Sequence, residues 1–120
     1  MPLNRKQFGS DAENLAKNYL LQLGYRFVTA NYTCHLGEID LIFIDNDQIV
    51  FAEVKARHHT RFGQPQEAIN HTKLKKLSQT ALHYFTQHPH GPQHGRLDAL
   101  AIDYSADPPR ITHLKNISPL

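Results

Sequence analysis

Residues 37–57, GEIDLIFIDNDQIVFAEVKAR, hold two apolar runs joined by a cluster of turn-forming residues. Runs of Ile, Leu, Val and Phe on either side of Asp and Asn are typical of two β-strands in a hairpin. If Asn46 and Asp47 form a two-residue turn, the commonest hairpin loop, the register of the two strands is fixed. Asp40 then lies opposite Glu53, on the same face of the sheet as the lysine two residues after Glu53.

Charged side chains in this hairpin need an explanation, because charges are costly to bury without partners. Opposed Cβ atoms lie ~5 Å apart, so the Asp40 and Glu53 carboxylates would repel each other. A Mg²⁺ or Mn²⁺ ion between them would relieve the repulsion, since both metals prefer oxygen ligands. Lys55 would then assist an attacking water in metal-dependent phosphodiester hydrolysis. The alternative is a salt-bridge cluster at a strand end, with Lys55 paired to Glu53 or to Glu38, its predicted cross-strand neighbour.

The remaining patterns place helices and strands around this hairpin. Apolar residues recur at three- and four-residue steps over residues 8–23, which predicts a helix ended by Gly24. Pro65 suits the first turn of a second helix that reaches Gln87. Short apolar runs separated by turn residues predict strands at residues 25–32, 38–44, 48–56, 96–103 and 110–117. This order predicts a single α/β domain over residues 1–120, with a mixed central sheet flanked by helices.

Composition favours one soluble domain over a membrane protein or a disulfide-stabilised one. The chain has 120 residues, 40% of them apolar, and a formal net charge of +2. Cys34 is the only cysteine, so no internal disulfide can form. No apolar run approaches the ~20 residues needed to span a bilayer, and the first residues lack the apolar core of a signal peptide. We therefore expect a cytoplasmic protein with no membrane partner.

Asp40 followed by Glu53-Val54-Lys55 resembles the motif of the PD-(D/E)XK nuclease superfamily, whose restriction-endonuclease-like core is α-β-β-β-α-β. A closer resemblance is to the YraN family of small, largely uncharacterised bacterial proteins, which is similar to the archaeal Holliday-junction resolvases. The matching motifs follow in order along nearly the whole chain: Gly9-x-x-Ala12-Glu13-x-x-Ala16, Gly37-Glu38-Ile39-Asp40-Leu41-Ile42, Phe51-x-Glu53-Val54-Lys55-x-Arg57, Phe62-Gly63-x-Pro65, Lys73 and Arg96-Leu97-Asp98.

The resemblance implies a Mg²⁺- or Mn²⁺-dependent endonuclease that acts on DNA, including branched DNA, and a homodimer that supplies two active sites. It implies that Asp40, Glu53 and Glu13 bind the metal and that Lys55 assists the water. Glu13 has an alternative role, because a serine three residues before it gives the spacing of a helix capping box. Glu38 would contact the metal through water or pair with Lys55. The alternative function is a non-catalytic nucleic-acid-binding or scaffold domain, since fold does not imply function.

Basic and polar side chains near these motifs are candidates for binding the phosphates of nucleic acid. The candidates are Arg57, Arg61, Gln66 and Lys73. The lysines at positions 75 and 76 fit an ordinary solvated helix face instead. Asp98, within an apolar strand, is expected to be structural.

Histidine and cysteine residues offer a competing metal site. His88, His90 and His94 would bind Zn²⁺ in a third class of function, a zinc-loop interaction module. The Pro- and Gly-rich loop that carries them gives little preorganisation. Cys34 and His35 are not expected to form a nucleophilic pair, because adjacent strand residues point to opposite faces.

Overall fold

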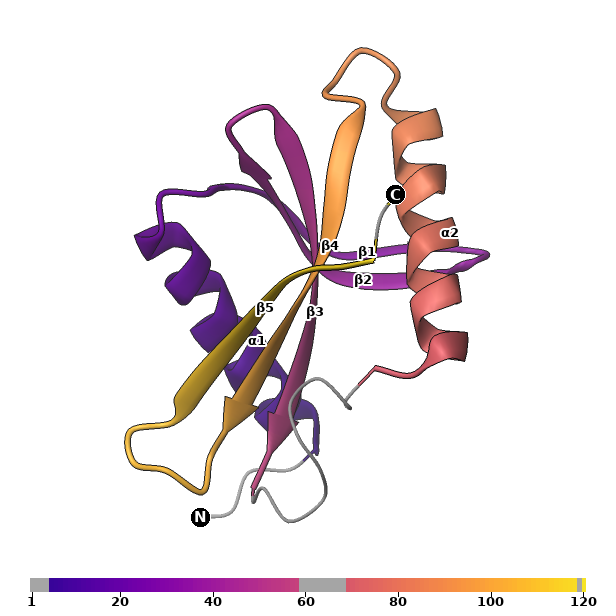
Figure 1. Cartoon of the computed structure of the whole chain (residues 1–120). Helices are drawn as coiled ribbons and strands as arrows, with labels where there is room; N and C mark the ends of the chain where they lie inside the picture. Colours follow the sequence, from indigo (N-terminus) through magenta and orange to yellow (C-terminus); the bar gives the residue numbers. More distant parts are fainter. Residues whose placement is uncertain (1–4, 59–68, 119) are drawn as a thin grey trace.

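The computed structural model describes residues 5–58, 69–118 and 120 of the chain (Figure 1). These residues form two helices and five strands in the predicted order, which confirms the α/β class. Neither helix is long and apolar enough to cross a membrane. The elements are α1 (Arg5–Gln22), β1 (Arg26–Cys34), β2 (Gly37–Asp45), β3 (Gln48–Arg57), α2 (His71–Gln87), β4 (His94–Asp103) and β5 (Arg110–Ser118).

The sheet is mixed, as predicted, and its strands lie side by side in the order β1-β2-β3-β4-β5. β1–β2, β2–β3 and β4–β5 are antiparallel pairs, whereas β3 and β4 are parallel. A parallel pair needs a long crossover connection, and α2 lies within the crossover from β3 to β4. The two helices cover opposite faces of the sheet (Figure 1).

Each face of the sheet packs against one helix to form a core. Ala12, Ala16 and Leu20, spaced four residues apart along α1, are buried against one face. The buried side of α2 packs on the other face through Leu77, Ala81, Tyr84 and Phe85. Because β2 and β3 are covered on both faces, their buried side chains belong to both cores and are almost all apolar.

The ends of the helices agree with the sequence patterns, except that α2 begins later. α1 is followed by Gly24, whose φ of 92° is the left-handed conformation expected after a helix. The prediction of a helix that runs without interruption from Pro65 is wrong, because residues 69 and 70 are not helical. Pro65 itself lies outside the described residues. Asn70 caps α2 instead, since its side-chain oxygen accepts a 2.9 Å hydrogen bond from the Lys73 amide. This bond satisfies an amide that has no partner within the helix.

The β2–β3 hairpin has the predicted register in the half nearest its turn. Asn46 takes a positive φ of 57° in the turn, and the paired residues run from there to Leu41 opposite Ala52. The ladder ends at this pair, before Asp40 and Glu53 are reached.

A buried ion-pair network ties β4 to β5. The Asp98 carboxylate is fully buried and accepts hydrogen bonds from Arg96 Nε (3.0 Å), His113 Nε2 (2.8 Å) and the Asn116 amide (2.9 Å). Burial alone would raise the pKa of Asp98, but these three partners outweigh it and hold the pKa below its usual range. Arg96 also bonds Asp45 beside the β2–β3 turn, at 3.0 Å. Asp98 is therefore structural, as the sequence predicted.

Replacing Asp98 by asparagine is expected to lower the free energy of unfolding by about 3 kcal/mol, because Arg96 would lose the fully buried one of its two carboxylate partners. Urea unfolding at pH 7 measures the change. Asp47→Asn, in the exposed turn, is the matched control and should stay within ~0.5 kcal/mol of the parent protein. A loss as small as that of the control would contradict the structural role of Asp98.

Candidate functional site

A cavity opens where β2 and β3 diverge. Beyond the last pair, Leu41 opposite Ala52, the β1–β2 hairpin runs beneath α2 while β3 continues in another direction (Figure 1). The cavity between them has a volume of about 440 Å³, which is within the usual range of ligand pockets. Its polar lining includes Glu38, Asp40, Glu53, Thr72, Lys73 and Lys76.

Asp40 lies at a break in the side-chain alternation of β2. Ile39 packs in the core beneath α2 and Leu41 in the core against α1, although residues two apart on a regular strand share a face. Asp40 Oδ2 accepts a 2.8 Å hydrogen bond from the Val54 amide of β3. The predicted regular ladder through Asp40 and Glu53 is therefore wrong, because the strand is irregular at this position. The two side chains nevertheless line the same cavity, and Glu53 acts directly on the pKa of Asp40.

The pKa of Asp40 is raised from 3.8 to about 8. Burial contributes most, because it removes water from the charged form. Glu53 adds to the shift through a hydrogen bond and its negative charge, whereas the Val54 amide and Lys73 oppose it. Asp40 therefore favours its protonated form at neutral pH. A cation that binds both carboxylates must displace this proton.

Two lysines face the carboxyl pair from different elements. Lys73 of α2 forms a 3.1 Å ion pair with Glu53 Oε2, whose side chain is only 7% exposed. Burial, followed by the contact with Lys73, lowers the pKa of Lys55 on β3, although Glu53 and Asp40 pull it upward. Burial also lowers the pKa of Lys73, but the hydrogen bond to Lys55 and the charge of Glu53 outweigh it, so the net shift is upward. Lys55 is therefore the amine that gives up its proton more easily.

Glu13, on α1, lies near Asp40 and Glu38. Together with Glu53, these side chains form the acidic group of the site. Burial and then the charges of Asp40 and Glu38 raise the pKa of Glu13. The capping-box alternative is wrong, because α1 begins well before Ser10 and both residues of the motif lie inside the helix. The predicted pair of Glu38 with Lys55 is also absent from the described β2–β3 ladder, which ends before reaching either residue.

Asn31 is a site residue that the sequence patterns did not reveal. It lies in β1 and takes a positive φ of 56°. With its amide nitrogen turned toward the acidic group, it donates to Glu13 Oε1 at 3.0 Å and to Glu38 Oε1 at 3.2 Å. Asparagine is unfavourable in strands but tolerates the left-handed conformation. An asparagine inside a strand pattern is therefore the signal that would have pointed to it.

Two of the four predicted phosphate-binding residues, Arg57 and Lys73, lie in the described part of the chain. Lys73 lines the cavity and is held by the ion pair with the acidic group. Arg57 is the last residue of β3, where that strand pairs with β4. Lys76, assigned from the sequence to a solvated helix face, also lines the cavity. Arg61 and Gln66 lie outside the described residues.

The histidine loop does not assemble a metal site within the described part of the chain. His88 instead forms a 2.9 Å hydrogen bond to the Tyr84 carbonyl oxygen and stacks on the Tyr84 ring. Three other potential ligands are brought together, namely Cys34, His35 and His83. The expectation that Cys34 and His35 point apart is wrong, because His35 lies in the turn after β1 and not in the strand.

Residues 12–102, which contain the whole cavity lining, match the model of a family described as Uncharacterised protein family UPF0102. The chain belongs to UPF0102. This membership confirms the resemblance to the YraN family. The UPF0102 description names no activity, so the chemistry of the cavity has to be argued from its residues.

Relatives in this family align with most of the chain. A UPF0102 protein of Renibacterium salmoninarum is 38% identical over 112 residues, covering 92% of this chain and 95% of the relative. A UPF0102 protein of Geobacter metallireducens is 35% identical over 116 residues, covering 97% and 95%. Another, from Psychromonas ingrahamii, is 44% identical over 98 residues, covering 82% and 80%.

Asp40→Asn is expected to stabilise the protein at alkaline pH when no divalent cation is present. Between the unfolded pKa of ~3.9 and the folded pKa of about 8, the folded state holds a proton that the unfolded state releases. Rising pH through this window therefore lowers the free energy of unfolding, by on the order of 1 kcal/mol per pH unit. Asparagine keeps an oxygen for the Val54 amide and removes this titration.

Urea unfolding from pH 5 to pH 9 in EDTA measures the difference between Asp40→Asn and the parent protein. The stability of the variant should fall less steeply with pH, and the variant should be the more stable protein at pH 9. Asp47→Asn, at an exposed carboxylate, should keep the slope of the parent. Equal slopes for Asp40→Asn and the parent would contradict the raised pKa of Asp40.

Proposed function

We propose that the protein is a metal-dependent endonuclease that hydrolyses the phosphodiester bonds of DNA, with branched DNA among its substrates. The observation that carries the proposal is the close approach of the Asp40 and Glu53 carboxyls beside the Lys55 amine. Glu13 completes the acidic group from the neighbouring helix. Carboxylates, an amine and an open cavity together supply what metal-assisted phosphodiester hydrolysis needs.

The acidic group suits a hard divalent cation such as Mg²⁺ or Mn²⁺. Asp40 and Glu53 offer carboxylate oxygens. Burial and then Glu53 raise the pKa of Asp40, so a bound cation would stabilise its charged form. Mg²⁺ typically binds one or two carboxylates and keeps its other positions for water and phosphate oxygens. Asp40 and Glu53 would hold the ion, with Glu13 as a further acidic neighbour. When bound, it would neutralise charge on the phosphate and make a water molecule more acidic.

Lys55 would act on the attacking water. Its lowered pKa makes the neutral amine easier to reach, and a neutral amine can accept a proton from water as the water attacks phosphorus. The water oxygen forms the new bond to phosphorus, the ester P–O bond breaks, and the departing sugar oxygen takes a proton from solvent. The Lys73 ammonium keeps its proton and would stabilise negative charge on the phosphate.

The first half of α2 suits the binding of a nucleic-acid backbone next to the carboxyl pair. Asn70, Thr72 and Lys73, at the start of the helix, line the cavity, and the positive end of a helix dipole favours anions. Lys75 and Lys76 are exposed on the same part of the helix. Together these groups would supply affinity for nucleic acid that does not depend on its sequence.

A nucleic-acid-binding or scaffold domain without catalysis is the second candidate. The ion pair between Lys73 and Glu53 favours it, because a lysine already neutralises one of the two carboxylates. In that function the lysines of the cavity would contact phosphates, and binding would not require a divalent cation.

Labelled duplex, single-stranded and four-way-junction DNA, each incubated with Mn²⁺ or with EDTA, separates these candidates. The proposal expects Mn²⁺-dependent cleavage that Lys55→Met slows by at least ~100-fold, the usual contribution of an acid–base group. Asp40→Asn should slow it by at least ~100-fold as well, because it removes a ligand of the metal that activates the water. Lys75→Met, at an exposed lysine of α2 outside the cavity lining, should cleave saturating DNA at the parent rate. DNA binding with no cleavage under any condition would support the second candidate and exclude the first. Cleavage that survived both site substitutions would mean that the reaction occurs elsewhere.

Lys73→Gln is expected to bind Mn²⁺ about fivefold more tightly at pH 9, because it removes a positive charge 3.1 Å from Glu53. At this pH, above the Asp40 pKa of about 8, most of Asp40 is ionised, which limits the competition between its proton and Mn²⁺. Isothermal titration calorimetry measures the affinity, and Lys75→Gln is the matched control with an expected unchanged Kd. Weaker or unaltered Mn²⁺ binding by Lys73→Gln would contradict the assignment of Glu53 as a ligand.

A further inference from the structure

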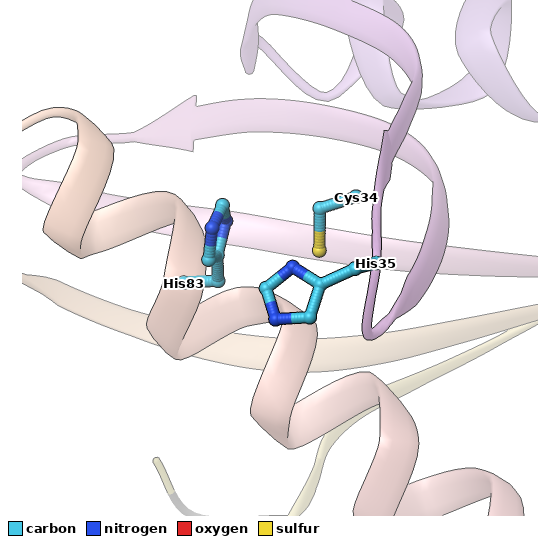
Figure 2. Close-up of side chains that lie close together, drawn as sticks. All are labelled: Cys34, His35 and His83. Atoms are coloured by element: carbon cyan, nitrogen blue, oxygen red, sulfur yellow. The ribbon is translucent and has the colours of Figure 1, made fainter.

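Three potential metal ligands meet between the tip of the β1–β2 hairpin and α2. Cys34 ends β1, His35 lies in the turn that follows, and His83 lies on α2. Figure 2 shows the Cys34 sulfur and the two imidazole rings gathered between the hairpin and the helix. One ligand atom from each residue lies within 4.8 Å of those of the other two. The fold therefore brings together a thiol and two imidazoles from distant parts of the sequence.

We propose that Cys34, His35 and His83 bind Zn²⁺. A thiolate and two imidazoles are ligands that zinc favours, whereas Mg²⁺ and Mn²⁺ favour carboxylate oxygens. Tetrahedral zinc, with bonds of ~2.0–2.3 Å, places its ligand atoms ~3.3–3.8 Å apart, so the three side chains would close in by about 1 Å. The exposed ring of His35 and the half-buried positions of the other two leave room for this adjustment. Three protein ligands leave a fourth position for solvent.

His83 has the support that a metal-binding histidine normally has. Its Nδ1 lies 2.8 Å from the Tyr32 hydroxyl. When Nδ1–H donates to this hydroxyl, Nε2 keeps its lone pair for the ion. Such a bond fixes both the tautomer and the orientation of a ligating imidazole. Tyr32 is itself packed edge to face against Tyr84, a buried residue of α2, so the support is anchored in the core.

The other two ligands also have contacts that suit the site. The Leu36 amide donates to Cys34 Sγ at 3.4 Å, and a hydrogen bond from a backbone amide stabilises negative charge on the sulfur. The rings of His35 and His83 meet edge to face, with their centroids 5.4 Å apart. The turn residue His35 is therefore already placed against the helix that carries the third ligand.

The hairpin sits closely on α2 beside these ligands. A Cβ atom added to Gly37 would lie 2.9 Å from Thr80 Oγ1, closer than real Cβ contacts allow, so the approach requires glycine. Thr80 and His83 lie about one helical turn apart, so this contact also fixes the distance from the hairpin to His83. Gly37 and Thr80 both line the acidic cavity. Zinc would therefore tie the hairpin to α2 at one wall of that cavity.

Titration of the untagged, full-length protein with Co²⁺, a spectroscopic substitute for Zn²⁺, tests the site. A thiolate bound to Co²⁺ gives a charge-transfer absorption band, and Cys34 is the only cysteine, so the band reports this residue alone. With excess Mg²⁺ present to occupy the acidic group, we expect one Co²⁺ per chain to give this band. Zn²⁺ should displace that Co²⁺ and should protect Cys34 from a thiol reagent. Absence of the band, or one ion shared between two chains in sedimentation, would overturn the proposal.

Variants assign the individual ligands. Cys34→Ser should abolish the band, and His35→Gln and His83→Gln should each weaken Co²⁺ binding at least about tenfold. His35→Gln is the cleanest of these, because the ring is exposed and its replacement leaves the core intact. Tyr32→Phe should weaken binding by about 10–100-fold through His83, as other supporting partners of metal ligands do. Unchanged binding in both histidine variants would overturn the site.

Two controls separate this site from the other potential metal sites. His90→Gln, at an exposed histidine between α2 and β4, should bind Co²⁺ with the parent affinity. Asp40→Asn should do the same, which distinguishes zinc binding here from cation binding at the acidic group. Loss of the band in either control, with the fold retained in circular dichroism, would place the bound ion elsewhere and overturn the assignment.

Discussion

The hydrogen bond from the Val54 amide to the Asp40 carboxylate is the interaction on which the candidate active site depends. The β2–β3 ladder ends at Leu41 and Ala52, and an amide inside a sheet still needs an acceptor. Asp40 supplies that acceptor with its side chain, at 2.8 Å, instead of with its backbone. The strands can therefore diverge without leaving this amide unpaired. The divergence opens the cavity, and the same bond holds a carboxyl group at its wall.

The acidic group that results is poor in positive charge. Lys73 compensates Glu53, but burial and Glu53 raise the pKa of Asp40 to about 8, and Glu13 is also shifted toward its neutral form. Asn31 helps by donating its amide to two of the carboxylates, although a neutral donor cannot cancel their charge. Perturbed ionisable groups that face a cavity are typical of functional sites, where stability is commonly lower than it could be. A bound cation is the simplest addition that would stabilise the charged forms of these carboxyl groups.

Local patterns were sufficient where the chain turns back on itself. The Asn46–Asp47 turn fixes the hairpin register without help from the rest of the fold, so the neighbourhood of Asp40 and Glu53 followed from counting residues. The break at Asp40 did not follow, because it depends on which core receives Ile39 and which receives Leu41. Periodicity shows that such residues are buried, but not against which helix.

The remaining differences from the sequence patterns have the same origin in contacts that are not local. Pro65 favoured an early helix start by propensity, whereas the Asn70 side chain fixes the start through a specific bond. Cys34 and His35 appeared unrelated when considered as consecutive strand residues. They meet because the chain leaves the strand at His35 and because α2 brings His83 to the same place. A crossover helix that lies over a hairpin cannot be placed from either segment alone.

The β1–β2 hairpin thus presents two kinds of ligand to one helix, with carboxylate oxygens where it diverges from β3 and sulfur and nitrogen at its tip. Lys73 contacts the acidic group from α2, and His83 belongs to the sulfur and nitrogen ligands. At a rise of 1.5 Å per residue, these two positions on the helix lie about 15 Å apart. This separation exceeds the Debye length of ~8 Å at physiological ionic strength, so two bound cations would repel each other only weakly. The ligand types also differ enough that oxygen-seeking and sulfur-seeking metals would not compete for one site. Any coupling between them would therefore be mechanical, carried by the close contact of Gly37 with Thr80, and not electrostatic.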